Sequence, residues 1–226
     1  MPKVSSMKKY IAASGMVIAA LTLFSFRPDA GVNAGFKSAD PRPAVNLIHQ
    51  DSTQWIQLFN GKDLTGWKHV GPGSMSVENG LIRGHGGMGL LYWAAHKVGH
   101  CTIKVVFRMK DSNDNSGVFI RIPIEPKEEW MPVFYGYEVQ IDNHPETSNE
   151  DEYHITGTLY SLTKPLAKPG KPGPQWNTME ITIDGPHTII VVHGEKVTDY
   201  RDGAAVPRSE ERRVGNECRY RWSPYH

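Results

Sequence analysis

Cysteine is nearly absent from this chain: only Cys101 and Cys218 occur among its 226 residues. Two cysteines cannot supply the disulfide framework that stabilises many small exported domains, so the fold depends on its hydrophobic core. Hydrophobic residues make up 39% of the chain, which is enough for one good core at this length. We therefore expect a single domain without an internal disulfide bond.

A hydrophobic run long enough to span a membrane comfortably is also missing. The longest apolar run, residues 11–26, follows a lysine-containing start and precedes small residues. This order is typical of a secretory signal. We expect a signal peptide over residues 1–34, a linker over residues 35–53, and export to the periplasm or the extracellular space, with membrane contact only during export. An uncleaved membrane anchor is the alternative.

Regular patterning is absent from the C-terminal tail, residues 208–226, which shows neither strand alternation nor a helical period. The tail resembles the translation of a sequencing-library adapter, with Asn216 and Tyr220 as departures. We interpret it as an artefact and expect the domain over residues 54–207 to be truncated, without its final strand. A genuine basic tail for an acidic partner is the alternative.

An excess of positive charge is lacking as well. Between the two ends, residues 35–207 contain more Asp and Glu than Lys and Arg. A mildly acidic domain without a basic stripe is a poor match for a phosphate backbone. Nucleic acid is therefore not an expected partner.

Helical periodicity is hard to find, whereas short alternating runs separated by Gly, Pro, Asn and Asp recur from Phe59 onward. Such spacing is typical of an antiparallel sandwich, and Asn79-Gly80 predicts one of its tight hairpins. The predicted strands cover approximately residues 56–59, 75–78, 81–83, 89–93, 101–109, 116–122, 136–142, 156–160, 178–184, 187–193 and 196–199. Longer loops are expected over residues 123–135, 143–155 and 164–174.

Two of these segments, residues 115–121 and 136–142, alternate polar and apolar side chains strictly. Because successive strand residues point to opposite faces, one set is expected to enter the core: Val118, Ile120, Val139 and Ile141. The other face then carries Phe119, Arg121, Glu138, Gln140 and Asp142. Charged, amide and aromatic groups together suit sugar hydroxyls, so this polar face is the candidate site. A merely solvated sheet face is the alternative.

Motifs in the same order across residues 54–202 resemble those of the 3-keto-disaccharide hydrolase family. They are residues 59–67, 77–82, 115–121 (Asn-Ser-Gly-Val-Phe-Ile-Arg), 136–142 (Gly-Tyr-Glu-Val-Gln-Ile-Asp), 156–160 and 176–177. The resemblance implies an all-β fold, a concanavalin A-like jelly-roll sandwich of two antiparallel sheets with a concave face that holds saccharide. The strand pattern agrees with this fold independently.

The resemblance also implies hydrolysis of glycosides or disaccharides already oxidised at C3 of the sugar ring. A C3 ketone acidifies the hydrogen at C2, so a modest base can remove it if the enolate is stabilised. The C1 leaving group then departs and water adds. On this chemistry Glu138 is the candidate base and Arg121 the enolate-side donor. Gln140 is an orienting hydrogen-bond partner, and His154 protonates the departing oxygen.

Sugar binding also needs stacking aromatics and paired polar groups. The candidate substrate-binding residues are Gln140, Asp142, Tyr137, Tyr160 and Trp176, with Trp130 as a further aromatic. The same groups would serve a carbohydrate-binding module without catalysis, because fold alone does not separate lectins from enzymes.

Two further alternatives concern the carboxylates. The interpretation as a conventional jelly-roll glucanase is weakened because the Cα atoms of Glu138 and Asp142 lie roughly 13 Å apart along a strand, farther than the carboxyl separations such enzymes use. Gln140 also stands where a second carboxylate is expected. A divalent metal among Asp142, His144 and His154 fits the residue types, although their spacing follows no specific pattern. No other cofactor is expected.

Overall fold

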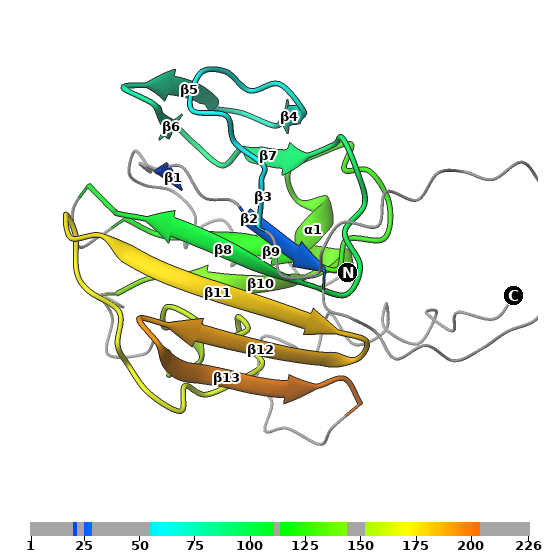
Figure 1. Cartoon of the computed structure of the whole chain (residues 1–226), viewed down its shortest axis with the longest axis vertical. Helices are drawn as coiled ribbons and strands as arrows, with labels where there is room; N and C mark the ends of the chain where they lie inside the picture. Colours follow the sequence, from blue (N-terminus) through cyan, green and yellow to red (C-terminus); the bar gives the residue numbers. More distant parts are fainter. Residues whose placement is uncertain (1–19, 22–24, 29–54, 111–113, 144–151, 204–226) are drawn as a thin grey trace, which may run out of the picture.

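The computed structural model describes residues 20–21, 25–28, 55–110, 114–143 and 152–203 (Figure 1). Nearly all regular structure in these residues is β, and every strand pairing is antiparallel. The predicted all-β sandwich of antiparallel sheets is confirmed. No helix in the described part of the chain is long and apolar enough to cross a membrane.

The strands are β1 (Ala20–Leu21), β2 (Ser25–Pro28), β3 (Ile56–Gln57), β4 (Trp67–Val70), β5 (Ser74–Glu78), β6 (Leu81–His85), β7 (Leu90–Trp93), β8 (Cys101–Phe107), β9 (Ser116–Ile120), β10 (Tyr137–Ile141), β11 (Asn177–Asp184), β12 (His187–Val192) and β13 (Glu195–Arg201). The helical turns are α1 (Met131–Tyr135) and η2 (Glu152–His154). Every predicted strand has a counterpart except residues 156–160, which pair with β10 through a single bridge.

The larger layer is a six-stranded sheet in the order β13-β12-β11-β8-β2-β3. Within it β11 lies between β8 and β12, with Ile181 opposite both Ile103 and Ile190. The alternation of β11 places Met179, Ile181 and Ile183 on its buried face and more polar residues on the other. Because one face is buried, a shift by one residue would expose this whole apolar set, which fixes the register.

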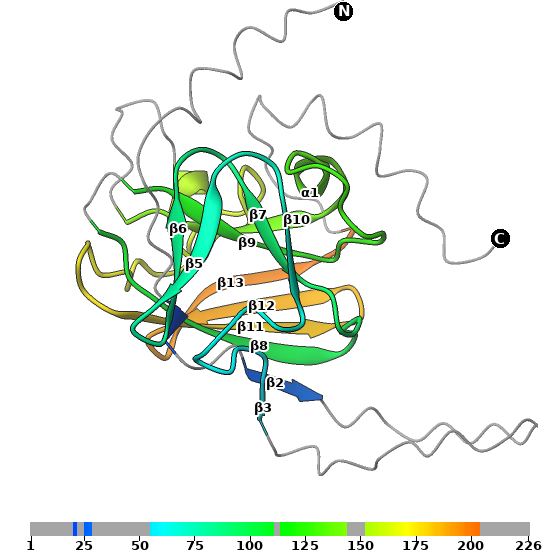
Figure 2. The same cartoon turned by 90° about the horizontal axis from the view of Figure 1, so that it is seen from above.

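The second layer is built on β9 and β10, which lie apart from β8, β11, β12 and β13 in Figure 2. Residues 156–160 extend it, because a bridge joins Leu159 to Val139 of β10. The side chains of Ile120, Val139, Ile141 and Leu159 join those of the six-stranded sheet in one hydrophobic core. The predicted core face of these two strands is therefore confirmed.

Two strand pairs have a small apolar cluster of their own. β5 and β6 are joined at Asn79-Gly80, where both residues have positive φ, as a tight hairpin requires. β4 pairs with β7, and the rings of Trp67 and Trp93 meet edge to face with centroids 5.4 Å apart. Phe59 is fully buried in the cluster.

Neither β4 nor α1 was predicted from the sequence. The four residues of β4 do not alternate cleanly between polar and apolar, so the strand shows itself only through its pairing with β7. α1 lies inside the loop predicted over residues 123–135. Its five residues are too few for a helical period, although Pro132 suits the first turn of a helix.

The strands β1 and β2 come from the segment predicted to be a signal peptide. β1 pairs with β6, and β2 pairs with β8 and β3. The export signal stays a prediction, and its cleavage would remove both strands. The predicted tail and missing final strand lie outside the described residues.

Candidate active site

Glu138 of β10 lies beside a glycine of β9. The strand register places Phe119 opposite Glu138 and Gly117 opposite Gln140, so these four positions share one face of the smaller sheet. A Cβ at position 117 would lie 2.2 Å from Glu138 Oε1 and 2.6 Å from Glu138 Cγ. The Glu138 side chain therefore lies directly over the Gly117 backbone, in space that only glycine leaves open.

Burial raises the pKa of the Glu138 carboxyl to about 8. The side chain is only partly exposed, between Phe119 on one side and residues 156–160 on the other. Removing water from a carboxyl disfavours its ionised form, which is the physical cause of the shift. A carboxylate with a raised pKa is a stronger base, so this group is suited to proton abstraction.

His154 of η2 is linked to Glu138 through Tyr160. Tyr160 N donates to the Glu138 carbonyl oxygen at 2.9 Å, so the Tyr160 side chain emerges on the same face as that of Glu138. The His154 ring stacks on the Tyr160 ring with centroids 4.4 Å apart, and His154 Nε2 shares a hydrogen bond of 2.9 Å with Ser161 Oγ. The structure therefore brings Tyr160 to the face of Glu138, and the His154 ring lies against Tyr160 from η2.

Gln140 and Asp142 continue along the face of Glu138, but they are 1% and 5% exposed. Asn115 links them, because its Oδ1 accepts from Gln140 Nε2 at 3.4 Å and its Nδ2 donates to Asp142 Oδ2 at 3.2 Å. The expectation of an open polar face along the whole strand is wrong at these two positions. Glu138 is the more exposed of the three side chains.

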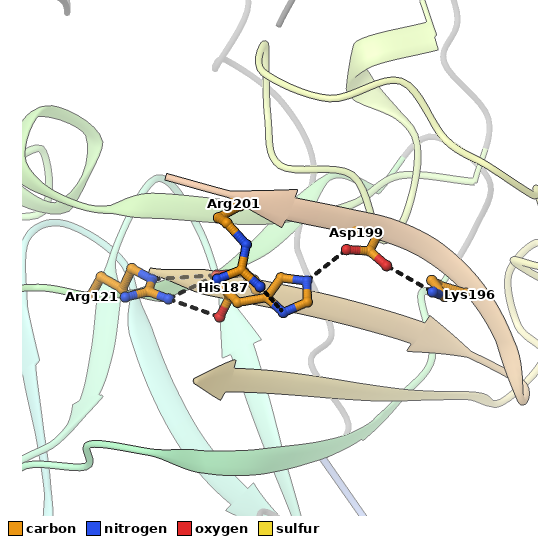
Figure 3. Close-up of polar contacts among 6 residues, drawn as sticks. Arg121, His187, Lys196, Asp199 and Arg201 are labelled. Atoms are coloured by element: carbon orange, nitrogen blue, oxygen red, sulfur yellow. Dashed lines mark hydrogen bonds and ion pairs between the residues drawn. The ribbon is translucent and has the colours of Figure 1, made fainter. Parts of the chain in front are cut away.

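Arg121 does not share the face of Glu138, contrary to the prediction. Its φ of 58° lies in the left-handed region, which ends the alternation of β9. Arg121 Nη2 donates to the His187 carbonyl oxygen and to Thr188 Oγ1, both at 3.1 Å, so the side chain points to β12 (Figure 3). Arg121 therefore ties β9 to the six-stranded sheet, and the structure does not place it as the enolate-side donor.

Two aromatic candidates make contacts other than the predicted stacking on a sugar. Tyr137 is opposite Ile120 on the core face, where its ring is buried and its hydroxyl donates to Asp202. Trp176 immediately precedes β11, and the Arg108 guanidinium lies 5.0 Å from its ring centroid. The structure therefore does not place Tyr137 where a sugar could stack, and it places Trp176 just before β11, beside Arg108.

A metal site is not formed by the described residues, in which no three His, Cys, Asp or Glu side chains come together. Of the three predicted ligands, Asp142 accepts a hydrogen bond from Asn115, and His154 shares one with Ser161. His144 lies outside the described residues.

Sequence reasoning did not single out Gly117 or Ser161. A glycine within a regular strand often marks the close approach of another group, and that signal could have identified Gly117. Ser161 carried no comparable signal, because its contact with His154 depends on the loop in which it has a φ of 54°.

Known proteins resemble this chain in sequence. The family model for the 3-keto-alpha-glucoside-1,2-lyase-like domain matches residues 54–218. A curated relative from Bacteroides thetaiotaomicron, named 3-keto-disaccharide hydrolase, is 25% identical over an alignment of 178 residues that covers 66% of this chain and 59% of the relative. The chain thus spans less than two thirds of that relative's length.

A solved structure resembles the fold. The crystal structure of a Parabacteroides distasonis ATCC 8503 protein, provisionally assigned as a glycosyl hydrolase, matches with a TM-score of 0.56 and 26% identity. The match covers 73% of this chain and 76% of that one. The family match also extends into residues 208–218 of the tail, whose origin as an adapter stays a prediction.

Proposed function

The chain belongs to the 3-keto-alpha-glucoside-1,2-lyase-like family, and from this premise we propose that it cleaves glycosides whose sugar ring carries a ketone at C3. The observation that carries the proposal is the Glu138 carboxyl, to which burial gives a pKa of about 8 on the polar face of β10. The name of the relative, 3-keto-disaccharide hydrolase, supports the class of substrate.

The first half of the reaction is an elimination. The C3 ketone acidifies the C2 hydrogen, because the negative charge left at C2 is delocalised onto the ketone oxygen. Ionised Glu138 takes this proton and leaves an enolate. The bond between C1 and the glycosidic oxygen then breaks, and its electron pair leaves with that oxygen, which His154 protonates. The sugar now has a C1–C2 double bond conjugated to the ketone.

Hydration completes the reaction. Water adds its oxygen to C1 and releases a proton. The protonated Glu138, which is partly exposed, exchanges its proton with solvent and then protonates C2. The sum of the two halves is hydrolysis of the glycosidic bond. One carboxyl serves first as base and then as acid, which requires a pKa near the working pH. Burial raises the pKa of Glu138 toward that range.

A conventional glycosidase would need a second carboxyl facing the sugar. Asp142 is the other carboxylate along this strand, and it is 5% exposed with its Oδ2 accepting from Asn115. This placement favours the elimination route, which needs a single carboxyl.

Two matched substrates test the proposal: a 3-keto-glucoside and the same glucoside with its C3 hydroxyl intact. We expect the aglycone to be released only from the keto form, because only its C2 hydrogen is acidic. Release at comparable rates from both would favour a conventional glycosidase. Binding of either sugar without any release would leave a carbohydrate-binding module as the function.

A further inference from the structure

A cavity of about 240 Å³ lies between the β5–β6 hairpin and the residues that follow β8. Part of its wall is apolar, from Leu81, Met109 and Pro174. The cavity shares no lining residue with the polar face around Glu138. Its volume is below that of a drug-sized site and is suited to a single sugar ring.

Three cations line this cavity, and one of them is neutralised there. Arg83 Nη1 pairs with Glu78 Oε2 at 2.9 Å. Hydrogen bonds from Ser76 and Arg83 lower the pKa of Glu78, so it stays ionised as the partner of Arg83. In the described part of the chain, no carboxylate pairs with Arg108 or Lys110, which are the other two cations. The lining therefore has a net positive charge.

Arg108 is held by an aromatic ring rather than by a counter-ion. Its guanidinium lies 5.0 Å from the ring centroid of Trp176. A cation–π contact orients a guanidinium without neutralising it, so the charge remains available to an anion. Lys110 is exposed to solvent and can move toward a ligand at low cost.

We propose that this cavity binds a sugar unit that carries a carboxylate, at a site separate from the ring that Glu138 attacks. The carboxylate lies between Arg108 and Lys110, because charge-assisted hydrogen bonds to both cations are stronger than those of neutral donors. The C–H face of the ring packs against Leu81 and Pro174, which are the apolar lining residues that reach the surface. The choice of a sugar rests on the proposed function, whereas the anionic group rests on the charges of the cavity.

Calorimetric titration of the full chain with glucuronate and with glucose tests this site. We expect glucuronate to bind about tenfold more tightly than glucose, because one charge-assisted hydrogen bond contributes about that much to affinity. This preference should weaken as the salt concentration is raised. Lys110→Gln and Arg108→Gln each weaken glucuronate binding about tenfold. Lys127→Gln, at an exposed lysine outside the cavity, is the matched control and leaves binding unchanged.

Equal affinity for the two sugars would overturn the proposal that this cavity binds an anionic sugar. Unchanged glucuronate binding in the Lys110→Gln variant would overturn it as well. Inorganic phosphate that competes as strongly as glucuronate would overturn its assignment to a sugar. The Glu138→Gln variant is expected to bind glucuronate as tightly as the unsubstituted chain, and weaker binding there would overturn the separation of the two sites. Since the titration measures binding, it can be interpreted even if the proposed cleavage fails.

Discussion

Gly117 determines where the Glu138 carboxyl lies: a Cβ at position 117 would be 2.2 Å from Glu138 Oε1. The carboxyl can therefore lie against the backbone of β9, where burial raises its pKa to about 8. The position and the basicity of the carboxyl thus depend on the same strand glycine.

Gly117→Ala is expected to displace the Glu138 carboxyl while the sheet stays folded. A misplacement of about 1 Å can cost on the order of 100-fold in rate, so we expect a loss of that size in kcat for a 3-keto-glucoside. The pKa read from the pH dependence of kcat/KM should also move toward the ordinary carboxyl range. Gly99→Ala is the matched control, because a Cβ there meets open space. An active Gly117→Ala variant with an unshifted pH profile would contradict this account of Gly117.

The pH dependence of kcat/KM is expected to follow the ionisation of Glu138. Burial raises its pKa to about 8, so the carboxylate that accepts the C2 proton forms as the pH rises through that value. For a nitrophenyl 3-keto-glucoside, whose leaving group needs no proton from His154, we expect kcat/KM to increase from about pH 6 to about pH 9 and then to level off. A kcat/KM that falls over this pH range would show that the protonated form of Glu138 is the active one, which would contradict its role as the base.

His154→Gln is expected to affect glycosides according to their leaving groups. An alcohol or sugar leaving group needs a proton, so its release should slow by about 10²- to 10⁴-fold. A nitrophenol leaves as the anion, and its release should change much less. His100→Gln is the matched control, since His100 is exposed and pairs with Asp184. Equal losses for both leaving groups would remove His154 from the role of acid.

Arg121→Ala is expected to reduce stability rather than chemistry. It removes the hydrogen bonds to Thr188 Oγ1 and the His187 carbonyl oxygen, and bonds from a charged donor contribute about 1.5–3 kcal/mol each at most. We expect a lower free energy of unfolding in denaturant and a kcat within a few-fold of the unsubstituted chain. The double variant Arg121→Ala with Thr188→Val should lose less free energy of unfolding than the sum of the losses in the two single variants, because both remove the same hydrogen bond. A stable but inactive Arg121→Ala variant would restore Arg121 to the mechanism.

The alternation of residues 136–142 predicted much of the smaller sheet. Val139 and Ile141 enter the core because a strand turns successive side chains to opposite faces, and this rule depends only on sequence order. The same rule failed at Arg121, since its positive φ redirects the side chain at the end of β9. The sequence does not encode that dihedral angle in any pattern that alternation can reveal.

The contacts of the candidate site were less predictable than its strand. Placing Gly117 beneath Glu138 requires the pairing register of β9 with β10, which follows from the assembled sheet. The stack of His154 on Tyr160 likewise depends on the turn that brings η2 back to this layer. Strand alternation and the family resemblance identified Glu138 as a candidate, residue type identified His154, and the fold supplied the relation between them.

Exchange of the C2 hydrogen in D2O tests the central claim most directly. The full chain and its Glu138→Gln variant are incubated with a 3-keto-glucoside, and deuterium at C2 of the released sugar is measured by NMR. We expect the unsubstituted chain to place deuterium at C2 as the aglycone is released. The folded Glu138→Gln variant should do neither. Cleavage by the unsubstituted chain without deuterium at C2, or undiminished exchange in the variant, would contradict proton abstraction by Glu138.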